Sequence, residues 1–452
     1  MRCAILAVLA ACSSDPHRTT PLYSDGTNLR DDHGRIALLR GVNARVNGVF
    51  DVTFSDGRMP LEPIPDLSDA DCTRMRQLGL DFLRLPINWS ALEPTRGSYD
   101  DAYLDRVDAA VQCAARAGVY VLIDLHQDAY SKEIGEDGAP LWAIQPAPTM
   151  LLQGPLTDLG TRRTSQQVND AFNTFFAAGD PSGLQAACID ALDHVATRFA
   201  DDPAVLGFEL YNEPPVGDTL VEPFSIAAAT RVRAAAPDKL VLFEPSAVRN
   251  LVDFAPKAQA RFPVANAVYA PHIYTYVFAS DQTPLMNLDP ADLEASVAGT
   301  RAESTAWHTP LVIGEFGIGP TQSNADLWMG VQAQLHDRYL ASDAFWVWKE
   351  ESQASWGVFD HNADDTWTER PQVVAWLSRP HAARIAGTVT ANDYDYTARA
   401  LHLETHGGGT HSIYTPADGA TFTCNGTALT ATRDGGTGLS EIACDGVLDV
   451  TP

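Results

Sequence analysis

Short apolar runs alternate with amphipathic stretches along most of this chain. The apolar runs are four to seven residues long, which is the usual length of a β-strand. They are apolar almost throughout rather than at alternate positions, so we expect strands that are buried on both faces of a sheet. The predicted strands are Ile36–Val42, Phe82–Pro86, Val119–Leu125, Val205–Leu210, Leu240–Glu244, Ala267–His272, Leu311–Glu315 and Phe345–Trp348.

The stretches between these runs have the apolar spacing of helices. Predicted helices cover Ser68–Leu78, Asp101–Ala117, Gly183–Ala200 and Asp326–Leu340. Ser68, followed by Asp69 and Asp71, is a helix start signal, and Gly79 and Gly118 are stop signals. Strands that alternate with helices predict an α/β fold with a parallel sheet, and a count of eight strands favours a closed (β/α)8 TIM barrel.

The chain divides into a barrel and a smaller part. The barrel is predicted over residues 31–380, after a polar tether at residues 13–30. Two long loops, at 44–66 and 127–182, leave the carboxyl ends of strands, where barrel active sites are built, and we expect them to rise over that face. Residues 384–452 carry short alternating runs between Gly, Asn and Asp clusters, which predicts a small antiparallel β-sandwich-like domain.

The first twelve residues are typical of an export signal. One basic residue, Arg2, precedes a short apolar run that ends in small residues, and the run is too short to span a bilayer. The run ends in Leu9-Ala10-Ala11-Cys12, which resembles the lipobox of bacterial lipoproteins. In those proteins the equivalent cysteine is lipidated after cleavage. We therefore expect an exported protein with a lipid anchor at Cys12; ordinary secretion and a cytosolic protein are the alternatives, and no transmembrane helix is predicted.

The charge excludes one class of partner. The chain has 31 Lys and Arg against 58 Asp and Glu among its 452 residues, a formal net charge of −27. Proteins that bind nucleic acid need basic side chains to neutralise phosphates, so no nucleic-acid partner is expected.

Seven cysteines bear on compartment and metal binding. Cys424 and Cys444 flank a small Gly- and Thr-rich segment and are predicted to form a disulfide in an oxidising compartment. Cys72, Cys113 and Cys188 lie in predicted helices, so a Cys72–Cys113 bridge and three buried free thiols are both open. No Cys and His spacing is typical of a zinc site.

Two glutamates at strand ends are the strongest sign of chemistry. Asn212 and Glu213 end the fourth predicted strand, and Glu315 ends the seventh. Cleavage of a glycosidic bond requires one carboxylic acid that protonates the leaving oxygen and one ionised carboxylate. Arg84, at the end of the second strand, is predicted to pair with Glu315 and keep it ionised.

Further polar side chains end neighbouring strands. His272 and Tyr274 follow the sixth strand, where His272 is predicted to tune the acid and Tyr274 to hydrogen-bond the nucleophile. His126 and Asp128 follow the third strand and are interpreted as ligands of sugar hydroxyls. For single residues of this kind, packing or a structural hydrogen bond is the alternative.

Two tryptophans end the last predicted strand. Trp348 is predicted to offer its indole as an apolar platform for a pyranose ring. Trp346 points the opposite way along a strand and is therefore expected to pack in the barrel core or against helices.

These residues together resemble the active-site set of a known family. Arg84, His126, Asn212 with Glu213, His272, Tyr274, Glu315 and Trp348, in this order on strand ends, are similar to the active site of glycoside hydrolase family five. The resemblance covers about residues 30–380. It implies that Glu213 is the acid/base and Glu315 the nucleophile of a retaining double displacement, with no metal and no organic cofactor.

Within that family, segments 124–131 and 137–143 are similar to endoglycoceramidases. These enzymes split the β-linkage between a glycan and ceramide, and they carry a C-terminal β-sandwich. The resemblance implies a glycan or glycolipid substrate, with an apolar groove that the aromatic residues of loop 127–182 would supply; a small core of the loop's own is the alternative reading. One position departs from the pattern, because Arg45 stands where those enzymes usually have lysine, and this puts the substrate in question more than the chemistry.

Two other functions are consistent with the same sequence features. An endo-β-glucanase or mannanase that acts on polysaccharide would use the same two glutamates, but in an open cleft lined by several exposed aromatic side chains. A non-catalytic carbohydrate-binding protein on a barrel scaffold would bind glycans without turnover.

Overall fold

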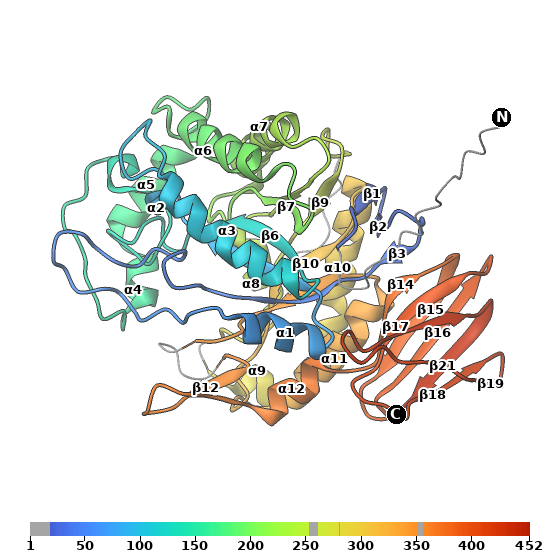
Figure 1. The fold of residues 1–452 in the computed structure, drawn as a ribbon. Coiled ribbons are helices and arrows are strands. Elements are labelled where there is room, and N and C mark those ends of the chain that lie inside the picture. Colours follow the sequence, from blue (N-terminus) through green and yellow to red (C-terminus); the bar gives the residue numbers. More distant parts are fainter. Residues whose placement is uncertain (1–18, 253–260, 280, 351–355) are drawn as a thin grey trace, which may run out of the picture.

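The computed structural model describes residues 19–252, 261–279, 281–350 and 356–452, except for the side chains of 250–252. An eight-stranded parallel sheet curls into a barrel (Figure 1). Isolated parallel bridges, Tyr269 with Leu311 and Ile273 with Phe316, join its first and last strands. In sheet order the strands are β10 (Val312–Phe316), β11 (Ser342–Phe345), β4 (Arg40–Asn43), β5 (Phe82–Ile87), β6 (Tyr120–Leu125), β7 (Val205–Glu209), β8 (Leu240–Phe243) and β9 (Ala267–Tyr269).

Helices cover the outside of the barrel (Figure 1). The longer ones are α1 (Asp69–Gln77), α3 (Asp101–Arg116), α6 (Leu184–Phe199), α7 (Asp218–Ala235), α10 (Pro290–Trp307) and α11 (Ala325–Arg338). The four predicted helices are confirmed within two residues at each end. The Ser68 hydroxyl accepts a hydrogen bond from the Asp71 backbone N–H, and the Ser68 backbone N–H donates to the Asp71 carboxylate, which is the capping box that begins α1. Short elements complete this part of the chain: α2 (Trp89–Leu92), α8 (Ala247–Val252), α9 (Thr283–Met286), α12 (Pro371–Leu377), β12 (Phe359–His361) and β13 (Trp367–Glu369).

The C-terminal β domain is confirmed, but it also takes in the start of the chain. One antiparallel sheet contains β1 (Tyr23–Asp25), β2 (Asn28–Arg30), β3 (Ile36–Ala37), β14 (His381–Ile385), β17 (Thr410–Tyr414) and β20 (Leu439–Ala443). The second contains β15 (Thr388–Asp395), β16 (Ala400–His406), β21 (Gly446–Thr451), β18 (Thr421–Cys424) and β19 (Thr427–Leu429). An apolar core that includes Ile36, Leu403, Phe422 and Val450 unites strands of both sheets.

Two boundaries therefore differ from the prediction. The predicted tether at residues 13–30 is wrong where the structure describes it, because β1 and β2 pair as a hairpin. The predicted strand Ile36–Val42 is two strands: β3 pairs with β14 of the β domain, whereas β4 enters the barrel. The export signal and Cys12 lie outside the described residues.

Buried ion pairs fix the β domain to the barrel. Asp337, at the end of α11, receives hydrogen bonds from Arg40 on β4 and from Arg379, which directly precedes the β domain. Its backbone carbonyl also accepts from Asn392 on β15. All four side chains are at least nine-tenths buried, so the two parts form one continuous packing unit.

The aromatic residues of loop 127–182 do not line a groove. This segment folds into η1 (Leu141–Ala143), α4 (Leu159–Arg163) and α5 (Gln166–Phe175). Phe172, Phe175 and Phe176 are buried and pack edge to face against Tyr130, Tyr211 and Phe224. These side chains therefore join the main apolar core of the barrel, so neither the predicted groove nor a separate core of the loop is what they form.

The cysteines of the described chain form two disulfides. Cys424 is bonded to Cys444 as predicted, and Cys72 on α1 is bonded to Cys113 on α3, which settles the alternative left open above. Cys188 is free and buried. Among the helices that the structure describes, none combines the length and the apolar character that a membrane span requires.

Candidate active site

Arg84 lies at the centre of the carboxyl end of the barrel. Its side chain is fully buried on β5. The guanidinium donates to Glu209 through Nε at 2.7 Å and through Nη2 at 3.1 Å, to Glu315 at 2.7 Å, and to the amide oxygens of Asn43 at 3.0 Å and Asn212 at 2.8 Å. A planar fork with five N–H donors suits such a position, because each donor finds an oxygen in a fixed direction. Arg84 thus ties the ends of β4, β5, β7 and β10 together.

Glu315 receives hydrogen bonds on both carboxylate oxygens. Arg84 donates to Oε1 at 2.7 Å, and the Tyr274 hydroxyl donates to Oε2 at 2.8 Å. Glu315 lies on β10 and is almost fully buried. Hydrogen bonds that a carboxylate accepts favour its ionised form and fix its rotamer. The predicted partners of Glu315 are therefore placed as expected.

Glu213 lies opposite, just beyond the end of β7. Its backbone has a positive φ of 42°, a conformation that side-chain-bearing residues seldom adopt outside special sites. Oε1 lies 2.8 Å from Nδ1 of His272, and the side chain is 28% exposed, so it is open to a ligand. Burial, and then the negative charge of Asp128, raise the pKa of Glu213 above its ordinary value. A raised pKa suits a carboxyl group that must carry a proton.

The two glutamates face each other at short range. One carboxylate oxygen of Glu213, one of Glu315 and a ring nitrogen of His272 all lie within 4.8 Å of one another. Retaining glycosidases hold their carboxyl groups about 5–5.5 Å apart, whereas inverting enzymes need about 6.5–9.5 Å to admit a water. The arrangement therefore has the geometry of a retaining pair.

Two neutral histidines border the pair. Burial lowers the pKa of both His272 and His126 to about 4, so neither carries charge at neutral pH. Nδ1 of His126 lies 2.7 Å from Asp124, which also pairs with Arg84 at 3.0 Å. Burial raises the pKa of Asp124 to about 7 in spite of that arginine. His126 is thus held rigidly at the edge of the site.

The predicted role of Trp348 is wrong, whereas Trp346 packs against the barrel core as expected and is also partly exposed. Trp348 is only 1% exposed, packs edge to face on Phe359 and donates its indole N–H to Asp71 at 3.1 Å, so it has no free face for a sugar. Trp346 is partly exposed and stacks on His126 with the ring centroids 5.8 Å apart. The cause is the length of the strand: β11 ends at Phe345, so alternation along a strand no longer orients the residues that follow.

Asp128 and Arg45 are engaged by other charged side chains. Asp128 forms a fork with Arg163 of α4, with Nε to Oδ1 at 2.7 Å. Arg45 is buried, and its guanidinium pairs with Glu62, with Glu350 at 2.9 Å and with Glu136 at 3.7 Å. That guanidinium also lies 5.9 Å from the centre of the Trp346 ring. Arg45 therefore places a buried positive charge beside Trp346 at this edge of the site.

Glu209 and Glu244 were missed by the sequence reasoning. Glu209 is fully buried and holds both Nε and Nη2 of Arg84. A carboxylate inside an apolar strand was the available signal, because such a group is tolerated only with a buried partner. Glu244 ended a predicted strand in the same way as Glu213 and Glu315.

Within the part of the chain that the structure describes, two sets of side chains have the spacing of metal ligands. They are Glu209, Glu244 and His272, and Glu213, His272 and Glu315. Arg84 donates at 2.7 Å to both Glu209 and Glu315, so the counter-cation of these carboxylates is part of the chain itself.

Comparison with known proteins gives one consistent result. Residues 61–352 match the sequence model of the cellulase family, glycosyl hydrolase family 5. Endoglycoceramidase I of Rhodococcus hoagii (strain 103S) is 31% identical over 66% of this chain and 63% of its own length. A glucosylceramidase of Cryptococcus neoformans var. grubii is also 31% identical, over 42% of this chain and 33% of its own length. These alignments span less than two thirds of either relative.

Solved structures match over nearly the whole chain. Endo-glycoceramidase II from Rhodococcus sp., in a lactosyl-enzyme intermediate, superposes with a TM-score of 0.75 at 25% identity over 94% of this chain and 99% of that one. A crystal structure of endogalactoceramidase superposes with a TM-score of 0.76 at 24% identity, over 96% and 99% of the two chains. Both matches include the barrel and the β domain.

Proposed function

This chain belongs to the cellulase family, glycosyl hydrolase family 5, and from that membership we propose that it is a retaining β-glycosidase that releases the glycan from a glycosphingolipid. The observation that carries the proposal is the pairing of Glu213 and Glu315, whose carboxylate oxygens approach within 4.8 Å and whose partners differ. Glu315 has two donors that stabilise its charge, whereas burial favours the protonated form of Glu213.

The proposed reaction has two steps. Glu315 attacks the anomeric carbon while Glu213 gives its proton to the leaving oxygen, which yields a covalent glycosyl-enzyme and a free aglycone. Glu213, now ionised, then takes a proton from water, and the resulting hydroxide displaces Glu315 from the sugar. Two inversions leave the configuration at the anomeric carbon unchanged.

The surroundings of the pair suit this sequence. Neutral His272 contacts Glu213 at 2.8 Å and adds no positive charge that would lower the pKa of Glu213 and remove its proton before the reaction. Tyr274 donates to Oε2 of Glu315 and Arg84 donates to Oε1. Both oxygens therefore keep their direction while the carboxylate attacks the sugar and loses its negative charge. Trp346, stacked on His126, offers the apolar ring face that a bound pyranose needs.

An aromatic surface next to the nucleophile supports a lipid aglycone. Phe278 is 55% exposed and stacks on Trp356, with ring centroids 5.7 Å apart. Both rings contact Tyr274, the partner of Glu315, at 5.0 and 6.1 Å. An apolar chain that leaves the cleaved bond would lie against these rings. The relatives named for action on glycosylated ceramides support the same substrate class.

A polysaccharide substrate is less well supported. An endo-β-glucanase needs a row of exposed aromatic platforms for successive sugars. Among the residues that the structure describes, the large aromatic side chains with high exposure are Tyr23 and Phe278, and Tyr23 belongs to the N-terminal hairpin of the β domain. Phe278 alone cannot bind a chain of sugars, so a short glycan with an apolar aglycone fits better.

The test is ceramide release by the purified full chain from lactosylceramide, glucosylceramide and gangliosides, beside soluble β-glucans. We expect release from at least one glycolipid, and a loss of about 1,000-fold or more for Glu213→Gln and for Glu315→Gln. Glu294→Gln is the matched control, because Glu294 is an exposed residue of α10 that pairs with Arg338 at the surface.

The outcomes separate the remaining functions. Cleavage of β-glucan without any ceramide release would make the protein a polysaccharide hydrolase. Glycan binding without turnover on every substrate would make it a carbohydrate-binding protein. Near-wild-type turnover by either glutamine variant would overturn the assigned roles.

Export is part of the proposal. The two disulfides of the described chain support an oxidising compartment. Expression of the full chain in a bacterial host with labelled palmitate should give a lipid-labelled protein, and Cys12→Ser should lose the label. An unlabelled wild-type protein in the medium would instead indicate ordinary secretion.

A further inference from the structure

Glu244 lies directly behind the candidate acid. It follows β8, is 3% exposed, and contacts two parts of the acid's support. Its Oε2 accepts a hydrogen bond from the backbone N–H of Glu213 at 3.2 Å. Its Oε1 lies 3.5 Å from Nε2 of His272, the ring whose other nitrogen contacts the Glu213 carboxyl, and 3.6 Å from Nη2 of Arg84.

The backbone contact matters because of the conformation of Glu213. A residue with a side chain adopts a φ of 42° only when its surroundings hold it there. Glu244 receives the N–H of that residue, and so helps to fix the direction in which the Glu213 side chain leaves the backbone. A small change of that direction would move the proton away from the leaving oxygen.

The ring contact matters because a neutral imidazole has one N–H. When Nδ1–H of His272 donates to Glu213, the other ring nitrogen, Nε2, carries no hydrogen and can only accept. A protonated Glu244 carboxyl would donate to Nε2 and so hold His272 in this tautomer. Burial and the charge of Glu209 raise the pKa of Glu244 well above its ordinary value, which favours the protonated carboxyl. The proton suits Oε1, which faces Nε2, and leaves Oε2 as the acceptor for the backbone. A contact of 3.5 Å is at the outer limit of a hydrogen bond, as is common before substrate binds.

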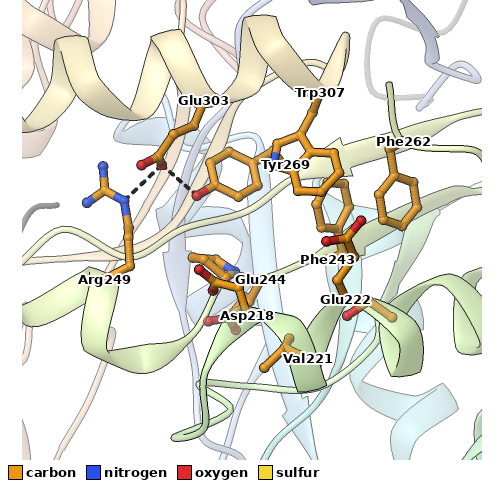
Figure 2. A pocket seen from close by; sticks show the side chains of 12 residues that line it. Asp218, Val221, Glu222, Phe243, Glu244, Arg249, Phe262, Tyr269, Glu303 and Trp307 are labelled. Carbon is orange, nitrogen blue, oxygen red and sulfur yellow. Dashed lines mark hydrogen bonds and ion pairs between the residues drawn. The ribbon is translucent and has the colours of Figure 1, made fainter. Parts of the chain in front are cut away.

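Charged and titratable groups surround Glu244 on both sides. Toward the catalytic pair they are Arg84, Glu209, Glu213 and His272. On the other side Glu244 lines a small pocket of about 40 Å³ between α7, α8, α10 and the strands (Figure 2). The titratable groups of that pocket are Asp218, Glu222, Arg249, Tyr269 and Glu303. Arg249 and Tyr269 both bond to Glu303, at 2.9 and 2.6 Å (Figure 2).

We propose that Glu244 is a positioning residue of the acid step, which holds the Glu213 backbone through Oε2 and the tautomer of His272 through a proton on Oε1. The inference rests on the proposed function, since it assigns Glu244 to the support of an acid/base. It also predicts which replacement is tolerated. A glutamine keeps one donor and one acceptor in the same places, whereas leucine keeps only the volume.

The experiment compares Glu244→Gln and Glu244→Leu on two soluble probes, 2,4-dinitrophenyl β-lactoside and 4-methylphenyl β-lactoside. The dinitrophenolate leaves without protonation, so kcat/KM for that probe does not depend on the acid. We expect Glu244→Leu to lose about 30-fold or more in kcat/KM on the methylphenyl probe and less than about threefold on the dinitrophenyl probe. Its kcat/KM on the methylphenyl probe should also begin to fall at a higher pH, because a His272 ring that no longer donates to Glu213 stabilises the Glu213 carboxylate less. Glu244→Gln should stay within about threefold of wild type on both probes.

Each contrary outcome has a distinct meaning. An equal loss on both probes by the leucine variant would overturn the inference, because misfolding or a general loss of packing affects both. A glutamine variant as impaired as the leucine variant on the methylphenyl probe would also overturn it, since the hydrogen-bond pattern would not be what matters. Failure of the wild-type protein to hydrolyse either probe or any glycolipid would instead remove the proposed function.

Discussion

At the scale of single residues, Arg84 is the organising side chain of the site. It bonds to the nucleophile candidate, to Glu209 and to the amides of Asn43 and Asn212 while fully buried. A buried charge is tolerated only when partners surround it, and here the ends of β4, β7 and β10 supply them. We expect Arg84→Lys to be severely impaired, because a single ammonium cannot reach the same set of oxygens.

The two tryptophans after β11 give a residue-scale prediction with an internal control. Trp346→Ala should lower kcat/KM on lactosides about tenfold or more, because it removes the ring stacked on His126 at the site. Its thermal midpoint should change little, since the side chain is partly exposed. Trp348→Ala should instead lower the free energy of unfolding by about 3–5 kcal/mol, because that indole is fully buried. Kinetics with scanning calorimetry on both variants checks this, and the reverse pattern would restore Trp348 as the sugar platform.

Much of the site was predictable from strand ends alone. Arg84, Glu213, His272, Tyr274 and Glu315 meet as expected, because the carboxyl ends of parallel strands share one face of a barrel. What failed was side-chain direction beyond a strand end, as at Trp348. The strand ended three residues earlier than its apolar run suggested, and an apolar run does not reveal where strand pairing ends.

At the scale of elements, the loops after β4 and β6 brace each other above the barrel. Arg58 bonds to the carbonyl of Leu152 at 2.8 Å, and Gly154 and Leu156 donate to the carbonyls of Met59 and Leu61 at 2.9 and 2.7 Å. This pairing joins segments nearly one hundred positions apart. Composition indicated that the loops were structured. It could not show that the aromatic side chains join the barrel core, because apolar content is the same in a groove and in a core.

The disulfide between α1 and α3 gives an element-scale prediction. It closes a loop of 41 residues, so the double variant Cys72→Ala/Cys113→Ala should lose about 2–4 kcal/mol of unfolding free energy. Denaturant unfolding of the oxidised wild type and of the variant measures the difference, with activity at low temperature as the control for folding. An unchanged midpoint would mean that the bridge does not constrain the unfolded chain.

At the scale of the whole molecule, the first described strands of the chain and its last strands belong to the same β domain. β3 near the start pairs with β14 after the barrel, and the barrel lies between them in sequence (Figure 1). The sequence predicted both parts, because their periodicities differ. It did not predict that the first strands join the last, because a pairing across more than three hundred residues has no local signal.

Buried acids give the whole molecule a predicted pH dependence of stability. The pKa values of Asp124 and Glu350 are each raised to about 7, chiefly by burial, and those of Glu136, Asp137 and Glu244 are also raised by burial. Such groups bind more protons in the folded state than in the unfolded state, so their stabilising contribution is complete below the unfolded pKa of about 4. The contribution of Asp124 and Glu350 is lost as pH rises through 7. Calorimetry should therefore show a thermal midpoint that falls between pH 5 and pH 8. A midpoint that rises over this range would show that these acids are ionised in the folded protein.

The most direct test of the central claim is to trap the covalent intermediate. The full chain is incubated with 2,4-dinitrophenyl 2-deoxy-2-fluoro-β-lactoside and digested, and the labelled peptide is identified by mass spectrometry. We expect one glycosyl group on the peptide that contains Glu315, and no label on the Glu315→Gln variant. A label on Glu213, or no label together with inverted product in an NMR assay of the native reaction, would contradict it.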